Sequence, residues 1–424
     1  MEITLPYGCD KLSFHLEDRR FIRMYDPIKA PAAADFEAEI LSAIENPIGV
    51  PKLEEIIFSG VKINIIVDDA SRPTPVSGIL PVLLQKLEGL GVNERQVRVI
   101  VALGSHRRMS EDELCDRVGA AVYSKYRVIN SEFRGADELV FVGKTPDGVE
   151  IFAMKAAMDA DIRIGIGNLV PHPVMGWSGG GKILYPGVAG EDTVSYFHLK
   201  GSLENGNLFG REDSPIRLMM EKWVDTIGLD FIINTVLNPD MQLHKAVAGH
   251  YIKAHRAGVT IAKRVLGCRV EQGADVVVAS AYPADQDFWQ SPKGMYSAEY
   301  ALKAETGGTI ILVSPNYEGI GPHREYPEWM GRDDGDEMVK GIFAGERFEG
   351  DALAMAIGNS MSKMRRRRKL VVVSDGVSAE EMAACCCVHY PASQLQQAVN
   401  DALAEYQDAT VAAISNGAET FLYH

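Results

Sequence analysis

The sequence predicts an α/β protein made of two α/β domains with mostly parallel sheets and an active-site cleft between them. Apolar runs rich in β-branched residues alternate along the chain with segments of helical periodicity, which is typical of strand–helix–strand units. The chain has 424 residues and is 46% hydrophobic, whereas a single core seldom grows beyond about 250–300 residues. We therefore expect two cores.

The first half of the chain contains three predicted strands, at 61–69, 96–104 and 161–170. The first is followed by a Pro-containing turn and by an apolar-periodic segment from Gly78 to Leu90, which predicts a helix. After the second strand, Ser110 and Glu113 form a capping box that opens another helix. The third strand leads into a glycine-rich segment.

The second half repeats this alternation, with predicted strands at 275–280, 309–314 and 370–375. We expect a first, cofactor-binding and catalytic domain at 1–271 and a second α/β domain at 272–404 that closes the cleft. The C-terminal tail, at about 405–424, can pack back on the first domain in this prediction.

The charge and the cysteine content of the sequence argue against several classes of protein. The formal net charge of −15 disfavours a nucleic-acid or anionic-membrane surface, because both require a cationic face. The six cysteines form no CxxC pair, and a run of three neighbours cannot make a disulfide framework. No signal-peptide pattern or membrane-spanning apolar stretch is present in the sequence. We expect a cytoplasmic protein; its oligomeric state stays open.

The segment from Pro171 to Gly190 contains the most unusual cluster of residues, with several glycines around Lys182. Glycines let backbone N–H groups approach an anionic ligand closely, and Ser178, Gly179 and Gly180 precede the lysine. Gly176 to Lys182 matches the spacing of a phosphate-binding P-loop, but Ile183 replaces the hydroxyl residue and Pro186 interrupts the following helix. The alternative is a tight surface loop with a solvated lysine.

Polar residues follow each of the three strands of the first domain, and two of them are histidines. His106 and His172 come after the second and third strands; facing one cleft, they would suit proton transfer on opposite faces of a substrate. Arg107 and Arg108 are expected to keep His106 neutral. His198 could add a third imidazole and form a zinc site, although no close-spaced ligand pair supports this.

The first strand is followed by Asp69 and Arg72. Arg72 can clamp a carboxylate or phosphate with two donors, or it can pair with Asp69 and brace the loop. In the second domain, Gln290 and Lys293 follow a predicted strand, from which they could reach across the cleft.

Taken together, these motifs resemble the nickel-dependent lactate racemases over nearly the whole chain. The matching segments, in the family's order, are DDASRPTP (68–75), ALGSHR (102–107), PHxxxGWSGGGK (171–182) and QSPKG (290–294). Trp177 and Gly181 depart from the family's common residues, and Ser291 and Pro292 separate Gln290 from Lys293. These departures leave open which acid is the substrate and whether the cofactor is covalently attached to Lys182.

The resemblance implies a racemase or epimerase that inverts C2 of a 2-hydroxy acid by reversible hydride transfer to a nickel-pincer nucleotide. The family's roles fall on Lys182 as cofactor tether, His198 as nickel ligand, and His106 and His172 as acid and base. Cofactor and substrate contacts fall on Asp69, Arg72, Gln290 and Lys293. Cofactor-maturation proteins are the expected partners. Two alternatives remain: a zinc-dependent hydrolase using the three histidines, and a non-catalytic carboxylate-binding protein of the same fold.

Overall fold

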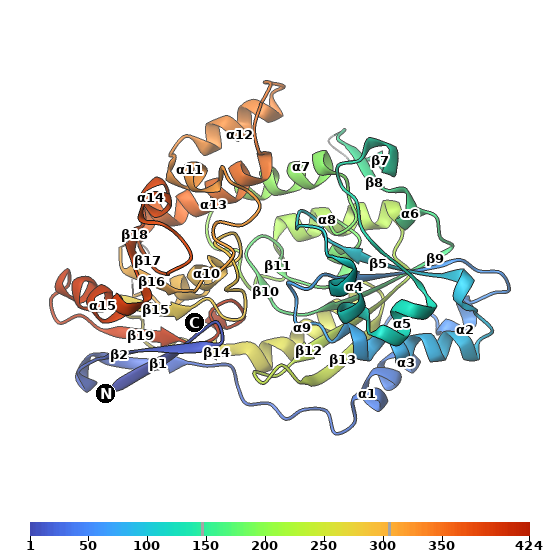
Figure 1. Ribbon diagram of the computed structural model, residues 1–424, viewed down its shortest axis with the longest axis horizontal. Helices are drawn as coiled ribbons and strands as arrows, with labels where there is room; N and C mark the ends of the chain where they lie inside the picture. The colour runs from blue at the N-terminus through green and yellow to red at the C-terminus, as the bar shows by residue number, and fades with distance from the viewer. Residues whose placement is uncertain (146–147, 304–306) are drawn as a thin grey trace.

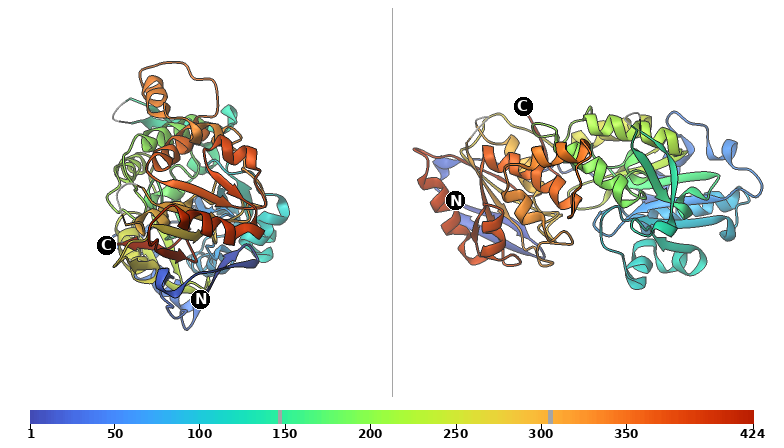
Figure 2. Two further views of the ribbon diagram at one scale, coloured as in Figure 1. Left: turned by 90° about the vertical axis from the view of Figure 1, so that its left-hand side faces the viewer. Right: turned by 90° about the horizontal axis from the view of Figure 1, so that it is seen from above.

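The computed structural model describes residues 1–145, 148–303 and 307–424, and two six-stranded sheets form the centres of its two halves (Figure 1, Figure 2). The first sheet has the spatial order β13 (Leu243–Gly249), β12 (Phe231–Leu237), β9 (Ile162–Asn168), β4 (Ile63–Asp68), β5 (Val97–Ala102), β6 (Arg127–Asn130). All neighbouring strands in it are parallel except β12 and β13. The predicted strands β4, β5 and β9 are confirmed, and the mixed α/β fold with mostly parallel sheets is confirmed with them.

Helices cover both faces of the first sheet. Successive side chains of its central strands point to opposite sides, so both faces carry apolar side chains that helices bury. Ile65 of β4 packs in one apolar cluster, and Ile66 packs in another. The helices around this sheet are α1 (Phe36–Glu45), α2 (Leu53–Ile56), α3 (Val76–Gly89), α4 (Glu111–Val118), α5 (Ala120–Lys125), α6 (Lys155–Met158), α7 (Glu191–Ser202), α8 (Pro215–Ile227) and α9 (Lys253–Leu266). The predicted capping box of Ser110 and Glu113 does open α4.

The second sheet is parallel throughout, in the order β18 (Val388–Tyr390), β17 (Lys369–Val373), β16 (Thr309–Val313), β15 (Val276–Ser280), β19 (Val411–Ile414), β3 (Phe21–Tyr25). Its predicted strands, β15 to β17, are also confirmed. The helices of this half are α10 (Lys293–Tyr300), α11 (Tyr326–Gly331), α12 (Gly335–Phe343), α13 (Ala352–Arg367), α14 (Ala379–Ala384) and α15 (Leu395–Ala404).

The N-terminal segment lies with the second sheet, although the expected domain limits put it in the first domain. β3 adds to the edge of the second sheet beside β19, and the hairpin of β1 (Glu2–Tyr7) and β2 (Asp10–His15) packs on the same sheet. Both segments are dark blue in Figure 1, where they lie beside the red C-terminal elements. Pairing between opposite ends of a chain has no local signal in the sequence.

The two halves are also joined by a pair of helices and by the last strand of the chain. α13 lies along α7, and the side chain of Lys363 donates a hydrogen bond to the Ser202 carbonyl oxygen at 2.6 Å. The last strand, β20 (Phe421–Tyr423), pairs with β14 (Gly267–Arg269), and the ring of Phe421 lies 5.5 Å from that of Trp177. The two remaining strand pairs are hairpins, β7 (Leu139–Lys144) with β8 (Glu150–Met154) and β10 (Pro171–His172) with β11 (Gly176–Trp177).

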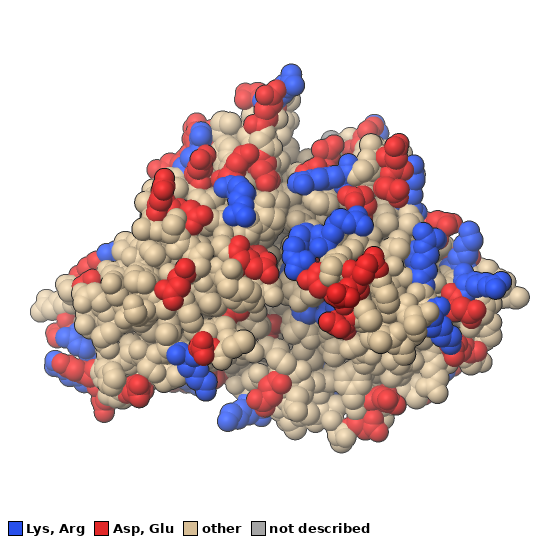
Figure 3. All heavy atoms as spheres, viewed as in Figure 1, with Lys and Arg blue, Asp and Glu red and all other residues tan. Residues whose placement is uncertain are grey.

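Acidic and basic side chains are interspersed over the face of the molecule seen in Figure 3. A search of the described residues found no helix with both the length and the apolar character needed to cross a membrane.

The hairpin of β1 and β2 provides a test of this fold. Phe14 is fully buried between the hairpin and the second sheet, so Phe14→Ala should lower the free energy of unfolding by about 3–5 kcal/mol in chemical denaturation. Phe58 is 55% exposed, and Phe58→Ala is the control, with a change below about 0.5 kcal/mol. Equal stability of the two variants would contradict the packing of the hairpin.

Candidate active site

One pocket in the cleft brings together all of the predicted site residues except Gly180. Its empty volume, with the open solvent at its mouth included, is about 1180 Å³. The predicted residues that line it are Asp69, Arg72, His106, His172, Ser178, Gly179, Lys182, His198, Gln290 and Lys293.

The carboxyl ends of the parallel strands explain how these residues meet. Asp69 follows β4, His106 follows β5, and His172 lies in the short strand β10 just after β9. From the second half, Gln290 and Lys293 lie at the start of α10, which follows β15. Both sheets therefore contribute residues to one pocket, as open parallel sheets commonly do at this edge.

His106 has a defined hydrogen-bonding state. Its Nδ1 lies 2.6 Å from Asp69 Oδ2, and because a carboxylate only accepts, Nδ1 carries the hydrogen. Its Nε2 lies 3.2 Å from the side-chain nitrogen of Gln290, whose carbonyl oxygen accepts from Lys293. An amide nitrogen only donates, so Nε2 of His106 presents a lone pair. His106 is thus arranged as a base.

Asp69 is kept ionised beside this ring. Burial acts to raise the pKa of its carboxyl, but His106, Arg72 and the Ser71 hydroxyl oppose burial and together lower that pKa. The Ser71 hydroxyl donates to Asp69 Oδ1 at 2.6 Å. The carboxylate therefore orients the imidazole and keeps its hydrogen on Nδ1.

His172 has the opposite arrangement. Its Nδ1 accepts hydrogen bonds from the backbone N–H groups of Val174 at 3.2 Å and Met175 at 3.1 Å. In a neutral imidazole the hydrogen then lies on Nε2. Burial lowers the pKa of His172 well below its ordinary value, and the charges of Lys182 and Lys293 lower it further. His172 is therefore arranged as a neutral hydrogen-bond donor.

His198 lies on α7 and is arranged as a potential metal ligand. Its Nδ1 lies 2.8 Å from the Val194 carbonyl oxygen, which only accepts, so Nδ1 carries the hydrogen and Nε2 has a free lone pair. Burial lowers the pKa of His198 to about 4, although the hydrogen bond to Val194 opposes this shift. A neutral ring fixed by a backbone carbonyl is the usual form of a histidine that binds a transition metal.

Two cations in the pocket lack protein partners. In the part of the chain that the structure describes, neither the Lys182 ammonium nor the Arg72 guanidinium makes a hydrogen bond or ion pair. Burial lowers the pKa of Lys182 to about 7, and the charge of Arg72 contributes to this shift. Such groups are available for an anionic ligand, and a lysine of this pKa is available as a nucleophile.

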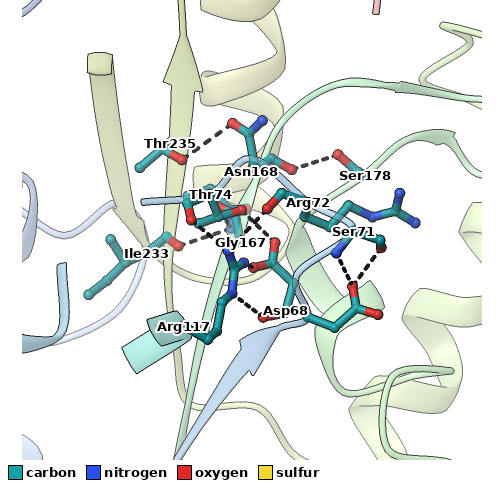
Figure 4. Close-up of polar contacts among 12 residues, drawn as sticks. Asp68, Ser71, Arg72, Thr74, Arg117, Gly167, Asn168, Ser178, Ile233 and Thr235 are labelled. Atoms are coloured by element: carbon teal, nitrogen blue, oxygen red, sulfur yellow. Dashed lines mark hydrogen bonds and ion pairs between the residues drawn. The ribbon is translucent and has the colours of Figure 1, made fainter. Parts of the chain in front are cut away.

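Arg117, which the sequence analysis missed, braces the loop after β4. Its guanidinium donates to the Asp68 side chain and carbonyl and to the carbonyl oxygens of Arg72 and Thr74 (Figure 4). The pairing of Asp69 with Arg72 that we considered as an alternative is not formed. Figure 4 shows the Arg72 side chain extending away from these contacts.

The glycine-rich segment is buried, which excludes the solvated surface loop. Trp177 is fully buried, and the buried Arg217 donates to the carbonyl oxygens of Met175 and Trp177. A 3₁₀ turn at Gly180–Ile183 follows instead of the long helix of a P-loop. The segment is therefore an internal wall of the pocket.

Two of the predicted ligand contacts in this wall already have protein partners. The hydroxyl of Ser178 donates to the Asn168 carbonyl oxygen at 2.6 Å (Figure 4), and the Gly180 N–H donates to the Asn234 side chain at 2.9 Å. Gly180 also packs close to the buried His255. Gly179, with φ +72°, lines the pocket at a backbone conformation that favours glycine.

We expected the charges of Arg107 and Arg108 to act on His106. Instead, Arg107 pairs with Glu113 and Arg108 pairs with Glu132, so both charges are balanced by nearby carboxylates.

The expectation of a zinc site is also not supported. Across residues 1–145, 148–303 and 307–424, no group of three or more His, Cys, Asp or Glu side chains is arranged to hold a metal ion. His106, His172 and His198 line one pocket without forming a ligand set, so a zinc site made of these histidines has no geometric support.

Comparisons with known proteins agree with this architecture. Residues 7–209 match the family model of the lactate racemase N-terminal domain, and residues 270–422 match that of the lactate racemase C-terminal domain. The chain is 32% identical to a lactate racemase from Lactiplantibacillus plantarum, over 80% of both chains. It is 29% identical to one from Thermoanaerobacterium thermosaccharolyticum, over 82% of both chains.

Solved structures give the same picture. The lactate racemase apoprotein from Thermoanaerobacterium thermosaccharolyticum matches with a TM-score of 0.87 and 26% identity, over the full length of both chains. A protein from Thermotoga maritima matches with a TM-score of 0.69 and 18% identity, over 94% of this chain and all of that one, and shares the fold.

The low pKa of Lys182 predicts selective reactivity in the protein without cofactor. Acetylation of Lys182 should rise with pH through about 7 and then level off, because the neutral amine is the nucleophile. An exposed lysine of ordinary pKa stays protonated in this range. Peptide mass mapping measures the rate, with exposed Lys222 for comparison. Equal labelling of the two lysines at pH 7 would contradict the assignment.

Proposed function

From the premise that this chain belongs to the lactate racemase family, we propose that it is an isomerase, a racemase or epimerase that inverts C2 of a 2-hydroxy acid. The observation that carries the proposal is the pair of histidines in one pocket with opposite hydrogen-bonding states. His106 presents a lone pair on Nε2, and His172 presents a hydrogen on Nε2. Inversion through a planar 2-keto acid needs a group that takes the hydroxyl proton and a group that returns one, and two such histidines serve the two configurations.

In the proposed reaction, His106 removes the hydroxyl proton from one enantiomer while Asp69 stabilises the imidazolium that forms. Gln290 leaves His106 Nε2 as the substrate hydroxyl arrives and turns its amide toward the substrate oxygen. His172 faces the same pocket and, in its imidazolium form, supplies a proton to the substrate oxygen when the opposite configuration is formed, which leaves a neutral ring. The reverse direction uses the two histidines in exchanged roles.

Arg72 and Lys293 hold the carboxylate of the acid in this proposal. Arg72 has free donors for two-pronged binding. Burial lowers the pKa of Lys293 well below its ordinary value, and the charges of Arg72 and Lys182 add to the effect. A bound carboxylate would raise that pKa again, because an opposite charge nearby favours the ammonium form. Lys293 would thus gain its charge as the substrate binds.

The pocket fits the family's nickel-pincer nucleotide. Lys182 is a partly buried amine with no hydrogen-bond or ion-pair partner among the described residues, and it suits a covalent or ionic tether. The Nε2 lone pair of His198 suits nickel. Gly179, Asp69 and Arg72 line the same pocket, and the two charged side chains provide polar contacts. When bound, the cofactor supplies a reversible hydride acceptor. Its synthesis would require cofactor-maturation proteins as partners.

A panel of single-enantiomer 2-hydroxy acids tests the proposed function. Protein produced together with the cofactor-maturation proteins should contain nickel, carry added mass on the Lys182 peptide if the tether is covalent, and abolish the optical rotation of at least one acid. Nickel-loaded protein that racemises no acid of the panel would contradict the proposal and favour a non-catalytic binding protein. Removal of nickel with a chelator should abolish turnover.

Variants of the two histidines test the acid and base roles. His106→Asn and His172→Asn should each lower kcat by about 10²- to 10⁴-fold, because asparagine cannot exchange a proton, while nickel content stays as in the wild type. His15→Asn, at an exposed position of β2, is the matched control. Racemisation at the wild-type rate in either pocket variant would refute its assignment.

A further inference from the structure

A second cavity adjoins the active-site pocket, and nothing described so far gives it a role. The two share Arg72, His172, Ser178, Gln290 and Lys293 as a common wall. The cavity has an open volume of about 790 Å³. On its other sides it is lined by Ala70, Ser71, Pro73, Val170, Pro171, Pro283, Ala284, Gln286, Ala418 and Glu419.

Glu419 lies on a well-fixed loop between β19 and β20. The Gly417 N–H donates to the Ser280 carbonyl oxygen at 2.9 Å. The Thr420 N–H donates to the Asn416 carbonyl oxygen, also at 2.9 Å. The Ser297 hydroxyl donates to the Thr420 carbonyl oxygen at 2.8 Å. Contacts on both sides of Glu419 therefore fix its backbone beside the cavity that its side chain lines.

The Glu419 carboxyl is buried without a partner. Its residue is only 8% exposed, and within the described ranges its carboxyl oxygens make no hydrogen bond or ion pair. Burial raises its pKa to about 7, and the charges of Lys293 and Arg72 oppose this rise. Because this carboxyl lines the cavity without a protein donor, it is available to a ligand that provides a hydrogen-bond donor.

We infer that this cavity is a subsite for the part of the substrate beyond C2, and that Glu419 selects acids with a hydroxyl group on that tail. The inference rests on the proposed function, in which Arg72 and Lys293 hold the carboxylate. Both residues lie in the wall between the two cavities, so a substrate anchored there has its tail beside Glu419. A hydroxyl on the tail donates to the carboxyl, whereas a second carboxylate is repelled by its ionised form.

Three acids of equal chain length test this selectivity: 2-hydroxypentanoate, its 5-hydroxy derivative and 2-hydroxyglutarate. In the wild type, kcat/KM for the 5-hydroxy acid should exceed that for 2-hydroxypentanoate by about tenfold or more, as expected for a hydrogen bond to a buried charged group. In Glu419→Leu this ratio should fall to about one. A ratio that persists in Glu419→Leu would overturn the inference.

Glu419→Gln provides a second, more conservative variant. The amide keeps a hydrogen-bonding group of the same shape but loses the charge, so 2-hydroxyglutarate should become a better substrate relative to 2-hydroxypentanoate. Glu318→Gln is the control, because Glu318 is an exposed acid beside a different part of the cleft and should leave all three ratios as in the wild type. An unchanged preference against 2-hydroxyglutarate in Glu419→Gln would also count against the subsite.

Calorimetric binding of the same three acids separates this inference from the proposed function. If the wild type binds the 5-hydroxy acid with a preference that Glu419→Leu loses, the subsite is supported even where no acid is racemised, and only the proposed function fails. If acids are racemised but neither binding nor kcat/KM depends on Glu419, the subsite is refuted and the proposed function stands.

Discussion

The site depends on the way Arg117 holds the loop after β4. Its guanidinium contacts Asp68 and the carbonyl oxygens of Arg72 and Thr74. It thereby pairs with the partly buried Asp68 and fixes the path of the backbone. Asp69 is then directed at His106, and the Arg72 guanidinium makes no hydrogen bond or ion pair with the residues that the structure describes. Had Arg72 been used to brace this loop, the pocket would have lost its best donor for a carboxylate.

A second constraint is the number of cations that share one buried pocket. Burial lowers the pKa values of Lys182 and Lys293, and the charge of Arg72 lowers both further. Burial with the charges of Lys182 and Lys293 lowers the pKa of His172. The protein tolerates this arrangement because the groups can give up protons until an anion binds. The lowered pKa also makes the Lys182 amine a nucleophile near neutral pH. The capacity of the pocket to bind an anion and the reactivity of Lys182 therefore have one electrostatic origin.

Much of this site was predictable because its residues follow strands with clear local patterns. The β-branched runs of β4, β5 and β9 identify the sheet, and the polar residues after them identify the cleft. Arg117 and Arg217 were missed because each lies within a helix, where an arginine is ordinarily a solvated side chain.

The positions of β3 and Glu419 were missed for a different reason. Each is brought to its place by contacts between segments far apart in the chain. Periodicity reports which face of an element is buried and gives no information on which distant segment covers it.

The two histidines also differ in a way that bears on inversion in both directions. Nδ1 of His172 accepts from the Val174 and Met175 N–H groups, so loss of the Nε2 hydrogen would leave an imidazolate unless Nδ1 gained a proton. Complete proton transfer from His172 therefore requires an imidazolium, and burial with the charges of Lys182, Lys293 and Arg72 opposes that form. A bound carboxylate or anionic cofactor neutralises these same cations. In the proposed reaction, ligand binding and the protonation of His172 are therefore coupled.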